Sequence, residues 1–177
     1  RAVDAPSYGG SEQVDYGLTP QEYLQVFVAS VNRIIEKDES FSIVGFSFGG
    51  ACGSAVAAHF GAKVRAMTVI GPGGFSIKDR PRLDFIRYGD VKDDPKAYRH
   101  ALKHNLLQLM LKHPESVDED VLDMQHDNVE RAKFNSRNVS AQPILPENLG
   151  KAGCRAQLIY GKDAVSYTHL RAHETYD

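Results

Sequence analysis

Residues 41–50 read Phe-Ser-Ile-Val-Gly-Phe-Ser-Phe-Gly-Gly, and they contain the pattern G-x-S-x-G around Ser47. The pattern directly follows a short apolar run at residues 41–44 and directly precedes residues 48–60, which are rich in small side chains. A strand, a tight turn and a helix in this order hold a G-x-S-x-G serine out of a sheet. The stretch therefore predicts an α/β fold built around a strand-to-helix turn at Ser47.

The geometry of such a turn predicts its chemistry. Gly45 and Gly49 are expected because side chains two positions either side of a strained serine would collide with neighbouring chain. The turn aims a helix N-terminus at the reacting centre, so Ser47 is predicted to be a nucleophile and the Phe48 backbone N–H half of an oxyanion hole. The alternative is a glycine-rich turn that cradles a phosphate, although the sequence there lacks G-x-G-x-x-G and G-x-x-x-x-G-K-[ST].

The flanking segments predict a parallel sheet. Residues 19–22 form a capping box with proline at the first helical position, and we expect the helix that begins there to end near Asp38. Residues 64–70 and 156–160 are two further apolar runs of the buried-strand type. Because strands and helices alternate along the chain, the strands are expected to lie parallel.

Residues 76–150 interrupt this alternation. The segment is polar and has helical periodicity on both sides of Pro114, with an apolar stripe in the first helix that includes Leu109. The second helix is expected over residues 117–133, and the acidic residues 118–120 are expected to cap its N-terminus. We interpret the segment as a helical insertion between strands.

The two ends of the chain differ from the rest. Residues 1–4 are expected to be the end of a strand, because the turn formers of residues 6–10 follow at once. Residues 165–175 resemble a frame translation of a common transposon-type sequencing adapter. We therefore expect the native sequence to end at Asp163 and residues 165–177 to lie outside the fold.

Composition excludes several classes of protein. The 177 residues are 42% hydrophobic and 25% charged, which is typical of a soluble globular domain. The 21 Lys and Arg residues face 23 Asp and Glu residues and form no basic stripe, so a nucleic-acid partner is not expected. The chain has no apolar run long enough for a membrane span. Its two cysteines lack disulfide or metal-site spacing, which favours a reducing, cytoplasmic location.

With these features in place, the chain resembles the α/β-hydrolase superfamily over nearly all of residues 1–163. Residues 4–11 are similar to the family's D-x-P-G-x-G-x-S loop, with Ser7 in place of glycine. Residues 158–163 look like the strand and turn that carry the family's catalytic acid, which places that acid at Ala164, where we expect the adapter to have replaced it. The resemblance implies a partial α/β-hydrolase fold, truncated at both ends, with no catalytic histidine in the chain.

The resemblance also implies how the chain is divided. In the family's strand order, a missing strand separates residues 1–4 from residues 41–44. We therefore expect residues 1–11 to be loosely attached and the chain to be prone to aggregation through unpaired strand edges. The implied divisions are a core segment with the nucleophile turn at residues 1–75, a helical cap or lid at 76–150, a core strand leading to the acid turn at 151–164, and a non-native tail at 165–177.

Within the superfamily, residues 71–75 (Gly-Pro-Gly-Gly-Phe) and the helical cap look like the carbon–carbon bond hydrolases of meta-cleavage products. Those enzymes typically read G-N-S-M-G-G at the nucleophile turn, where this chain has Phe46 and Phe48, and Gln125 is one candidate for the place of their cap arginine. The resemblance implies a serine hydrolase acting on an ester or a vinylogous keto-acid C–C bond. Phe46 and Phe48 predict a phenylalanine-lined pocket, which favours a small-molecule substrate with an apolar acyl or aryl group. No metal or cofactor is implied.

Two alternatives stay open. An acyltransferase, thioesterase or haloperoxidase-like relative would share every residue named above, and a non-catalytic hydrolase-like receptor or scaffold would keep the fold without a complete triad. We expect the 177-residue chain by itself to be inactive. His169 and His173 follow the acid position too closely for a further crossover and parallel strand, so we expect neither to reach Ser47.

Two features point to structure rather than to chemistry. His100 and His104 have metal-ligand spacing, but Ala101 stands where a zinc protease helix carries glutamate, so we expect solvated or packing histidines. Cys52 follows the predicted turn closely and is expected to be a small core residue.

Overall fold

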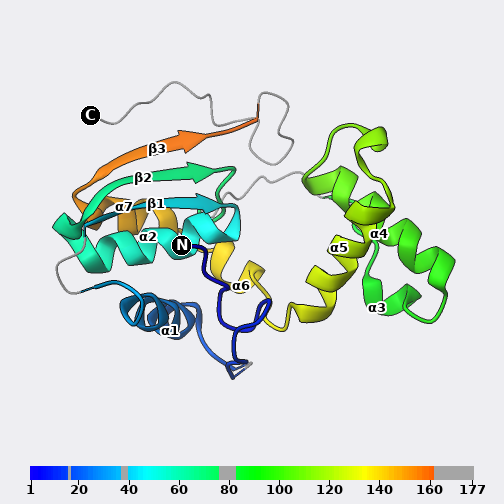
Figure 1. Ribbon diagram of the computed structural model, residues 1–177, viewed down its shortest axis with the longest axis horizontal. Helices are drawn as coiled ribbons and strands as arrows, with labels where there is room; N and C mark the ends of the chain where they lie inside the picture. Colours follow the sequence, from blue (N-terminus) through cyan, green and yellow to red (C-terminus); the bar gives the residue numbers. More distant parts are fainter. Residues whose placement is uncertain (16, 37–39, 76–82, 162–177) are drawn as a thin grey trace.

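The computed structural model describes residues 1–15, 17–36, 40–75 and 83–161. Figure 1 shows two lobes, one made of a sheet with helices packed on it and the other made of helices alone. The three strands are parallel and lie in the order β1-β2-β3. The predicted α/β class with a parallel sheet is therefore confirmed.

The sheet lobe contains the elements that the sequence indicated most clearly. Its strands are β1 (Phe41–Phe46), β2 (Val64–Ile70) and β3 (Arg155–Ile159), and its helices are α1 (Pro20–Asn32), α2 (Phe48–Phe60), α6 (Arg137–Ser140) and α7 (Ile144–Ala152), with a 3-10 turn, η1 (Gly61–Lys63), after α2. The predictions for β2 and α2 match these bounds, and the prediction for β3 is displaced by one residue.

Helix α1 begins as predicted and ends earlier than predicted. The Thr19 hydroxyl accepts a hydrogen bond from the Glu22 N–H at 3.3 Å, and the Glu22 carboxylate accepts one from the Thr19 N–H at 2.8 Å. The helix ends at Asn32 because the Arg33 N–H bonds the Ser30 carbonyl three residues back, which tightens the last turn. Asp38, where the end was expected, lies outside the described residues.

The core lies between one face of the sheet and the helices α1, α2 and α7. Close packing there depends on the small side chains of α2, because a Cβ on Gly53 would lie 3.0 Å from the Ile43 side chain. Tyr23 and Cys52 are fully buried between α1 and α2, and Leu145 of α7 is fully buried against β2. The same helix face that the sequence marks as small-residue-rich therefore lies directly on the strands.

The opposite face of the sheet is open, and it is apolar at the carboxyl ends of the strands. Phe46, Ile70 and Ile159 lie side by side in register at the carboxyl ends of the three strands, and all three are exposed. Val44, one row earlier, is 74% exposed. No helix among the described residues covers this face.

We expect Val44→Thr to reduce self-association of the chain without lowering its melting temperature, because the substitution removes an exposed methyl group and keeps a β-branched side chain. Val69→Thr is the matched control, since Val69 is fully buried on the helix-covered face. Burying its new hydroxyl should cost about 1–3 kcal/mol of unfolding free energy. Static light scattering measures self-association, and thermal unfolding measures the melting temperature. If the two variants changed both quantities equally, the assignment of Val44 to the open face and Val69 to the covered face would be contradicted.

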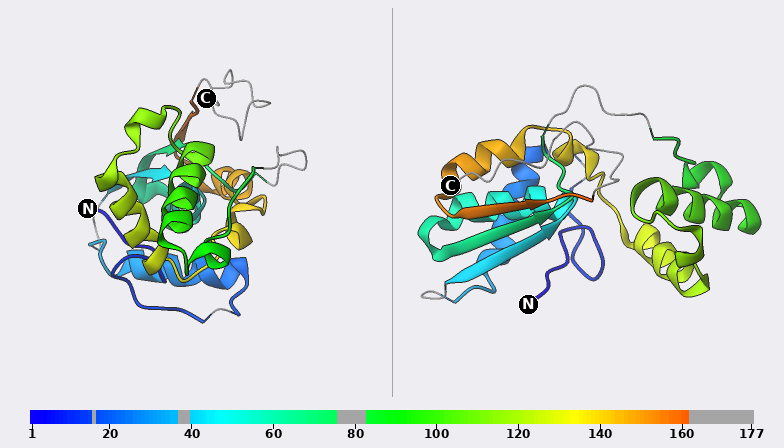
Figure 2. Two further views of the ribbon diagram at one scale, coloured as in Figure 1. Left: turned by 90° about the vertical axis from the view of Figure 1, so that its right-hand side faces the viewer. Right: turned by 90° about the horizontal axis from the view of Figure 1, so that it is seen from above.

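The second lobe is helical and lies on the side to which the carboxyl ends of the strands point, as Figures 1 and 2 show. Its own core contains Leu102, Leu106 and Leu122. Leu109 is exposed, so the predicted apolar stripe is wrong at its last member. The elements of this lobe are α3 (Tyr88–Val91), α4 (Pro95–Leu109), the 3-10 turn η2 (Pro114–Ser116) and α5 (Glu119–Arg131).

The two helices predicted on either side of Pro114 are confirmed as α4 and α5. The Asp118 carboxylate accepts a hydrogen bond from the Val121 N–H at 3.0 Å, so it caps α5 as the sequence indicated. The Arg99 guanidinium of α4 contacts the carboxylates of Glu119 and Asp123 on α5. These exposed ion pairs fix the approach of the two helices and contribute modestly to stability.

The predicted insertion at residues 76–150 divides between the lobes. Helices α3 to α5 form the separate lobe, whereas α6 and α7 pack on the sheet lobe, where Val139 and Leu145 are fully buried. A helical cap over the sheet would therefore consist of α3 to α5, and the return of the chain to the sheet would begin at α6.

The predicted strand at residues 1–4 is wrong, because the described residues there form no strand. Asp4 is instead part of a loop, in which its carboxylate accepts a hydrogen bond from the Gly10 N–H at 2.9 Å and its carbonyl accepts one from the Ser11 hydroxyl at 2.7 Å. Local hydrogen bonds satisfy this segment where no described strand pairs with it. Asp163, Ala164, His169 and His173 lie outside the described residues. Among the described residues, no helix has the length and apolar character that crossing a bilayer requires.

Candidate active site

Ser47 occupies the turn between β1 and α2 in a backbone conformation that non-glycine residues rarely adopt. Its φ is 50° and its ψ is −116°, and the residue is exposed. Its N–H donates to the Ile70 carbonyl at 2.9 Å, which fixes the turn to the end of the neighbouring strand. The predicted strand-to-helix turn with strained backbone is confirmed.

The glycines of the motif have different roles in this turn. A Cβ on Gly45 would lie 2.6 Å from the Gly49 carbonyl oxygen, so the expected collision exists on that side of Ser47. A Cβ on Gly49 would meet no atom within 4 Å, so the expected collision on the other side is wrong. The second close approach is at Gly50, where a Cβ would lie 2.9 Å from the Pro72 side chain.

The loop after β2 holds the Ser47 backbone from the opposite side. The Ser47 carbonyl accepts hydrogen bonds from the Gly50 N–H at 3.0 Å and from the Gly73 N–H at 3.2 Å. Gly71 at the start of this loop has a φ of 48°, a left-handed conformation that glycine adopts without strain. Hydrogen bonds from its own helix and from the loop after the adjacent strand therefore hold the strained turn in place.

Helix α6 extends this arrangement toward the second lobe. The Gly74 N–H donates to the Ser140 carbonyl at 2.7 Å, and the Leu145 N–H donates to the Gly74 carbonyl at 3.0 Å. A Cβ on Gly73 would lie 2.6 Å from the Ser140 Cβ. No local pattern predicts these contacts, because Ser140 and the glycines are almost seventy positions apart in the sequence.

Phe48 contributes a backbone donor and a packed ring. As the first residue of α2, it has an N–H that no carbonyl of the helix accepts. Its ring lies 5.6 Å from the Tyr8 ring and 5.8 Å from the Tyr23 ring. The Phe48 side chain thus packs against the core cluster with α1, and Phe46 is exposed on the open sheet face. The predicted pocket lined by these two phenylalanines is therefore wrong, because the two rings point to different sides of the sheet.

The loop at residues 4–11 is firmly attached near Ser47, so the expectation of loose attachment is wrong for its centre. Ser7, which stands in place of the family's glycine, is buried with a φ of 66°. Its hydroxyl accepts a hydrogen bond from the Val14 N–H at 2.9 Å, which offsets part of the strain of a left-handed serine. The Tyr8 hydroxyl donates to the Phe134 carbonyl at 2.7 Å, and burial raises the Tyr8 pKa.

The partners that a nucleophilic serine needs are not among the described side chains. No histidine within residues 1–15, 17–36, 40–75 and 83–161 hydrogen-bonds the Ser47 hydroxyl. The Gly71 N–H donates to the Ile159 carbonyl at 2.8 Å, so β3 ends at the same edge of the sheet as Ser47. Ala164, the predicted position of the acid, follows β3 in the sequence and is outside the described residues.

The described residues contain no group of three or more His, Cys, Asp or Glu side chains placed to hold a metal ion. The His100 and His104 ring centroids are 6.1 Å apart on α4. The His104 Nε2 contacts the Asp84 carbonyl, which gives this histidine a packing role at the start of the helical lobe.

Cys52 lies one turn after Ser47 and is fully buried, as predicted for a core residue. Burial raises the pKa of its thiol from 9.0 to about 12. Below pH 9 the thiol is protonated in both the folded and the unfolded chain, and its stabilising contribution is fully present. As pH rises from 9 toward 12, the thiol ionises in the unfolded chain only, so the free energy of unfolding falls.

In the native chain at neutral pH, we expect a maleimide to label Cys154, which is partly exposed, about a hundred-fold or more faster than Cys52. The physical reason is that reaction needs an accessible thiolate, which Cys52 does not provide. Mass spectrometry follows the labelling over time, and the Cys52→Ala and Cys154→Ala variants show which cysteine reacts fast and which reacts slowly. Rapid labelling of Cys52 would contradict its place in the core.

Comparisons with solved structures agree with this architecture. A meta-cleavage product hydrolase from Pseudomonas fluorescens IP01 superposes with a TM-score of 0.63 at 17% identity, over 93% of this chain and 62% of that one. A serine hydrolase from the polyaromatic hydrocarbon-degrading bacterium Cycloclasticus zankles gives 0.64 at 12% identity, over 93% and 62%. A thermophilic esterase gives 0.60 at 18% identity, over 97% and 64%.

The chain thus spans about three fifths of the length of these hydrolases, and at such identities the likeness establishes the fold alone. No curated protein matches the sequence significantly. Residues 1–176 match the sequence model described as the alpha/beta hydrolase family. The strained Ser47 turn, the parallel sheet and this match over nearly the whole chain lead to one conclusion: the chain belongs to the alpha/beta hydrolase family.

Proposed function

We propose that the protein is a serine hydrolase in which Ser47 is the nucleophile. The observation that carries this proposal is the backbone of Ser47, which is strained at φ 50° in an exposed position at the carboxyl edge of the sheet. Strain of this kind persists only where surrounding contacts enforce it, and here the contacts come from Ile70 and Gly73. A merely structural turn would not need a serine in this conformation.

The proposed reaction begins with attack of the Ser47 oxygen on a carbonyl carbon, while a general base removes the hydroxyl proton. Negative charge then develops on the carbonyl oxygen, and the Phe48 N–H is one of the donors that stabilise it. Loss of the leaving group gives an acyl-enzyme, and water releases the acid and restores the serine. The base and the orienting acid remain to be supplied from outside the described residues, with the acid proposed at position 164.

The bond class is proposed to be an ester or a C–C bond beside the carbonyl of a vinylogous keto acid. Solved structures of similar fold include a meta-cleavage product hydrolase and an esterase, which supports both classes. The substrate is proposed to be a small molecule with an apolar acyl or aryl group, since helices α3 to α5 lie beyond the edge of the sheet that carries Ser47, where a cap would enclose it.

The activity is proposed for the whole protein, because the chain spans about three fifths of the hydrolases that it resembles. We propose that the 177-residue chain by itself is inactive. Activity-based labelling with a fluorophosphonate compares the whole protein with the 177-residue chain, since the reagent modifies only an activated serine. We expect labelling at Ser47 in the whole protein and none in the chain alone.

Two assays then separate the bond classes. Hydrolysis of p-nitrophenyl esters of increasing acyl length would report on esterase activity, and loss of the absorbance of a 2-hydroxy-6-oxo-dienoate would report on C–C cleavage. Absence of both activities and of fluorophosphonate labelling in the whole protein would overturn the proposed function.

A further inference from the structure

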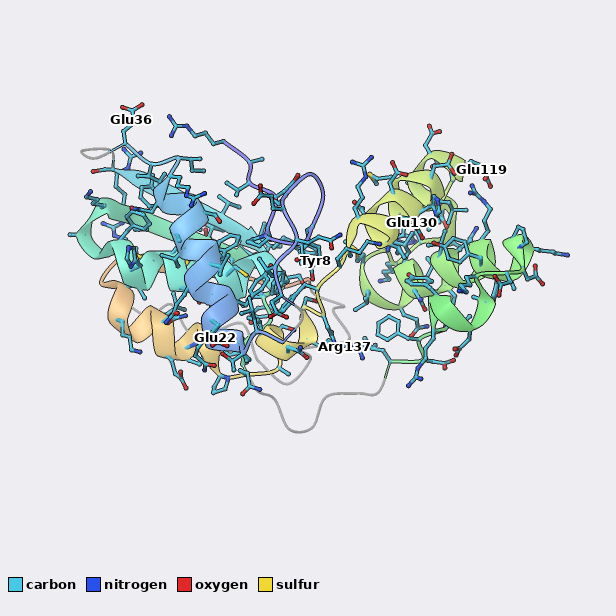
Figure 3. All side chains as sticks on the ribbon, turned by 90° about the horizontal axis from the view of Figure 1, so that it is seen from below. Tyr8, Glu22, Glu36, Glu119, Glu130 and Arg137 are labelled. Atoms are coloured by element: carbon cyan, nitrogen blue, oxygen red, sulfur yellow. The ribbon has the colours of Figure 1, made fainter. Side chains whose placement is uncertain are left out.

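A cavity of about 340 Å³ lies where the helical lobe meets α6, and Ser47 is not among its lining residues. Its walls come mainly from α4 and from the segment that leads into α3, with Arg137 contributed by α6. Figure 3 places Arg137 between the two lobes. A volume of this size is within the range of small-molecule sites.

One wall of the cavity is apolar and partly open to solvent. Leu106 is buried, whereas Leu109 and Met110 at the end of α4 are 53% and 54% exposed, and all three line the cavity. Exposed leucine and methionine side chains beside a cavity offer a surface that a hydrocarbon group could cover.

The lining also carries positive charge. Arg87 and Arg137 both line the cavity, and neither forms an ion pair with a carboxylate in the described part of the chain. The Arg137 guanidinium lies 5.1 Å from the centre of the Phe85 ring, which holds its plane against an apolar surface and leaves its N–H groups available. Gln125 adds an amide donor to the same lining.

The segment that carries Phe85 is held in place by a buried amide. The Asn105 side chain accepts a hydrogen bond from the Ile86 N–H at 3.0 Å and donates one to the Ile86 carbonyl at 2.8 Å. Asn105 is buried, and both of these bonds go to the Ile86 backbone, so the amide positions this part of the lining. The same cavity therefore combines a cation with apolar side chains, and Asn105 holds one segment of its lining in place.

We propose that this cavity binds a small amphipathic carboxylate, whose carboxylate pairs with Arg137 and whose hydrocarbon part lies against Leu106, Leu109 and Met110. Guanidinium forks match a planar carboxylate in a bidentate arrangement. A monoanion fits better than a phosphate dianion, because the mostly apolar walls penalise desolvation of the second charge. The inference does not depend on the proposed function, because it concerns residues that do not include Ser47.

Isothermal titration with 4-phenylbutyrate tests the proposal on the chain as it exists, at low ionic strength. We expect one binding site and an affinity about ten-fold or more above that for the neutral 4-phenylbutanol. This comparison needs no variant, so it stands even if a substitution disturbs folding. Equal affinities for the acid and the alcohol, or several equivalent weak sites, would overturn the proposal.

Variants locate the site. Arg137→Gln should weaken 4-phenylbutyrate binding about ten-fold or more, whereas Arg131→Gln should not, since Arg131 is an exposed arginine of α5 that pairs with Asp127 and does not line the cavity. Ser47→Ala should leave binding unchanged. Equal effects of the two arginine variants, or loss of binding in Ser47→Ala, would overturn the assignment to this cavity.

Discussion

Ser47→Ala is expected to lower kcat/KM of the whole protein by about a thousand-fold or more while leaving its fold intact. The nucleophile is the one group whose loss leaves only binding and the oxyanion donors to accelerate the reaction. Folding should survive because the Ser47 side chain makes no cap hydrogen bond and the residue is exposed. Steady-state kinetics on the preferred substrate, with circular dichroism to verify folding, measures the effect.

Ser42→Ala is the matched control for this experiment. Ser42 is also an exposed serine of β1, four residues before the end of the strand, and it belongs to no proposed machinery. Its substitution should leave kcat/KM unchanged within about two-fold. If Ser47→Ala kept most of the activity, another residue would be the nucleophile and the protein's chemistry would differ from the proposal.

The sequence predicted the Ser47 turn well because the signals for it are local. A buried strand, the G-x-S-x-G spacing and a small-residue helix follow one another within twenty positions, and each restricts the backbone independently. The capping box of α1 is local in the same way, since Thr19 and Glu22 satisfy each other. Features fixed by neighbours in sequence are therefore the ones that were predicted to within about one residue.

Contacts between distant segments explain what the sequence could not predict. Whether a glycine is required depends on what lies across from it, and Pro72 rather than the neighbouring chain makes the close approach at Gly50. The attachment of the loop around Ser7 and Tyr8 likewise depends on residues 133 and 134, whose N–H and carbonyl bond this loop. Periodicity carries no information about such pairs.

The division of residues 76–150 between the lobes has the same cause. Helices α5 and α7 are both amphipathic, and nothing in their spacing says which sheet or helix covers the apolar stripe. Leu145 is buried in the sheet lobe because the Leu145 N–H and the Gly74 carbonyl bond each other, which brings α7 to the end of β2. A tertiary hydrogen bond decides the assignment.

Only part of the candidate site could be predicted from the sequence, and the reason is chemical. A nucleophile motif is contiguous, whereas a catalytic triad is assembled from residues far apart in sequence that the fold brings together. Ser47 and the Phe48 N–H are recognisable from the motif alone. Arg137 and its cavity carry no motif, because a cation stacked on Phe85 is visible only once α6 and the helical lobe are placed.

Gly45→Ala is expected to destabilise the protein by about 3 kcal/mol or more, whereas Gly49→Ala is expected to stabilise it by up to about 0.5–1 kcal/mol. The new Cβ at position 45 would lie 2.6 Å from the Gly49 carbonyl oxygen, and backbone cannot move aside as a flexible side chain can. At position 49 the same methyl group meets no atom within 4 Å and favours the helical backbone of α2. The two motif glycines, equivalent in the sequence pattern, thus give effects of opposite sign.

Urea-induced unfolding of the two variants, measured by circular dichroism on the same preparation of the whole protein, compares them directly. The alanine at position 49 also provides the control for adding a methyl group to a motif glycine, since only the surroundings differ. Equal destabilisation by both substitutions would show that the turn depends on glycine for its flexibility rather than for the contact at Gly45. A large loss of unfolding free energy in Gly45→Ala alone would instead show that glycine is required at position 45 because the Gly49 carbonyl leaves no room for a side chain there.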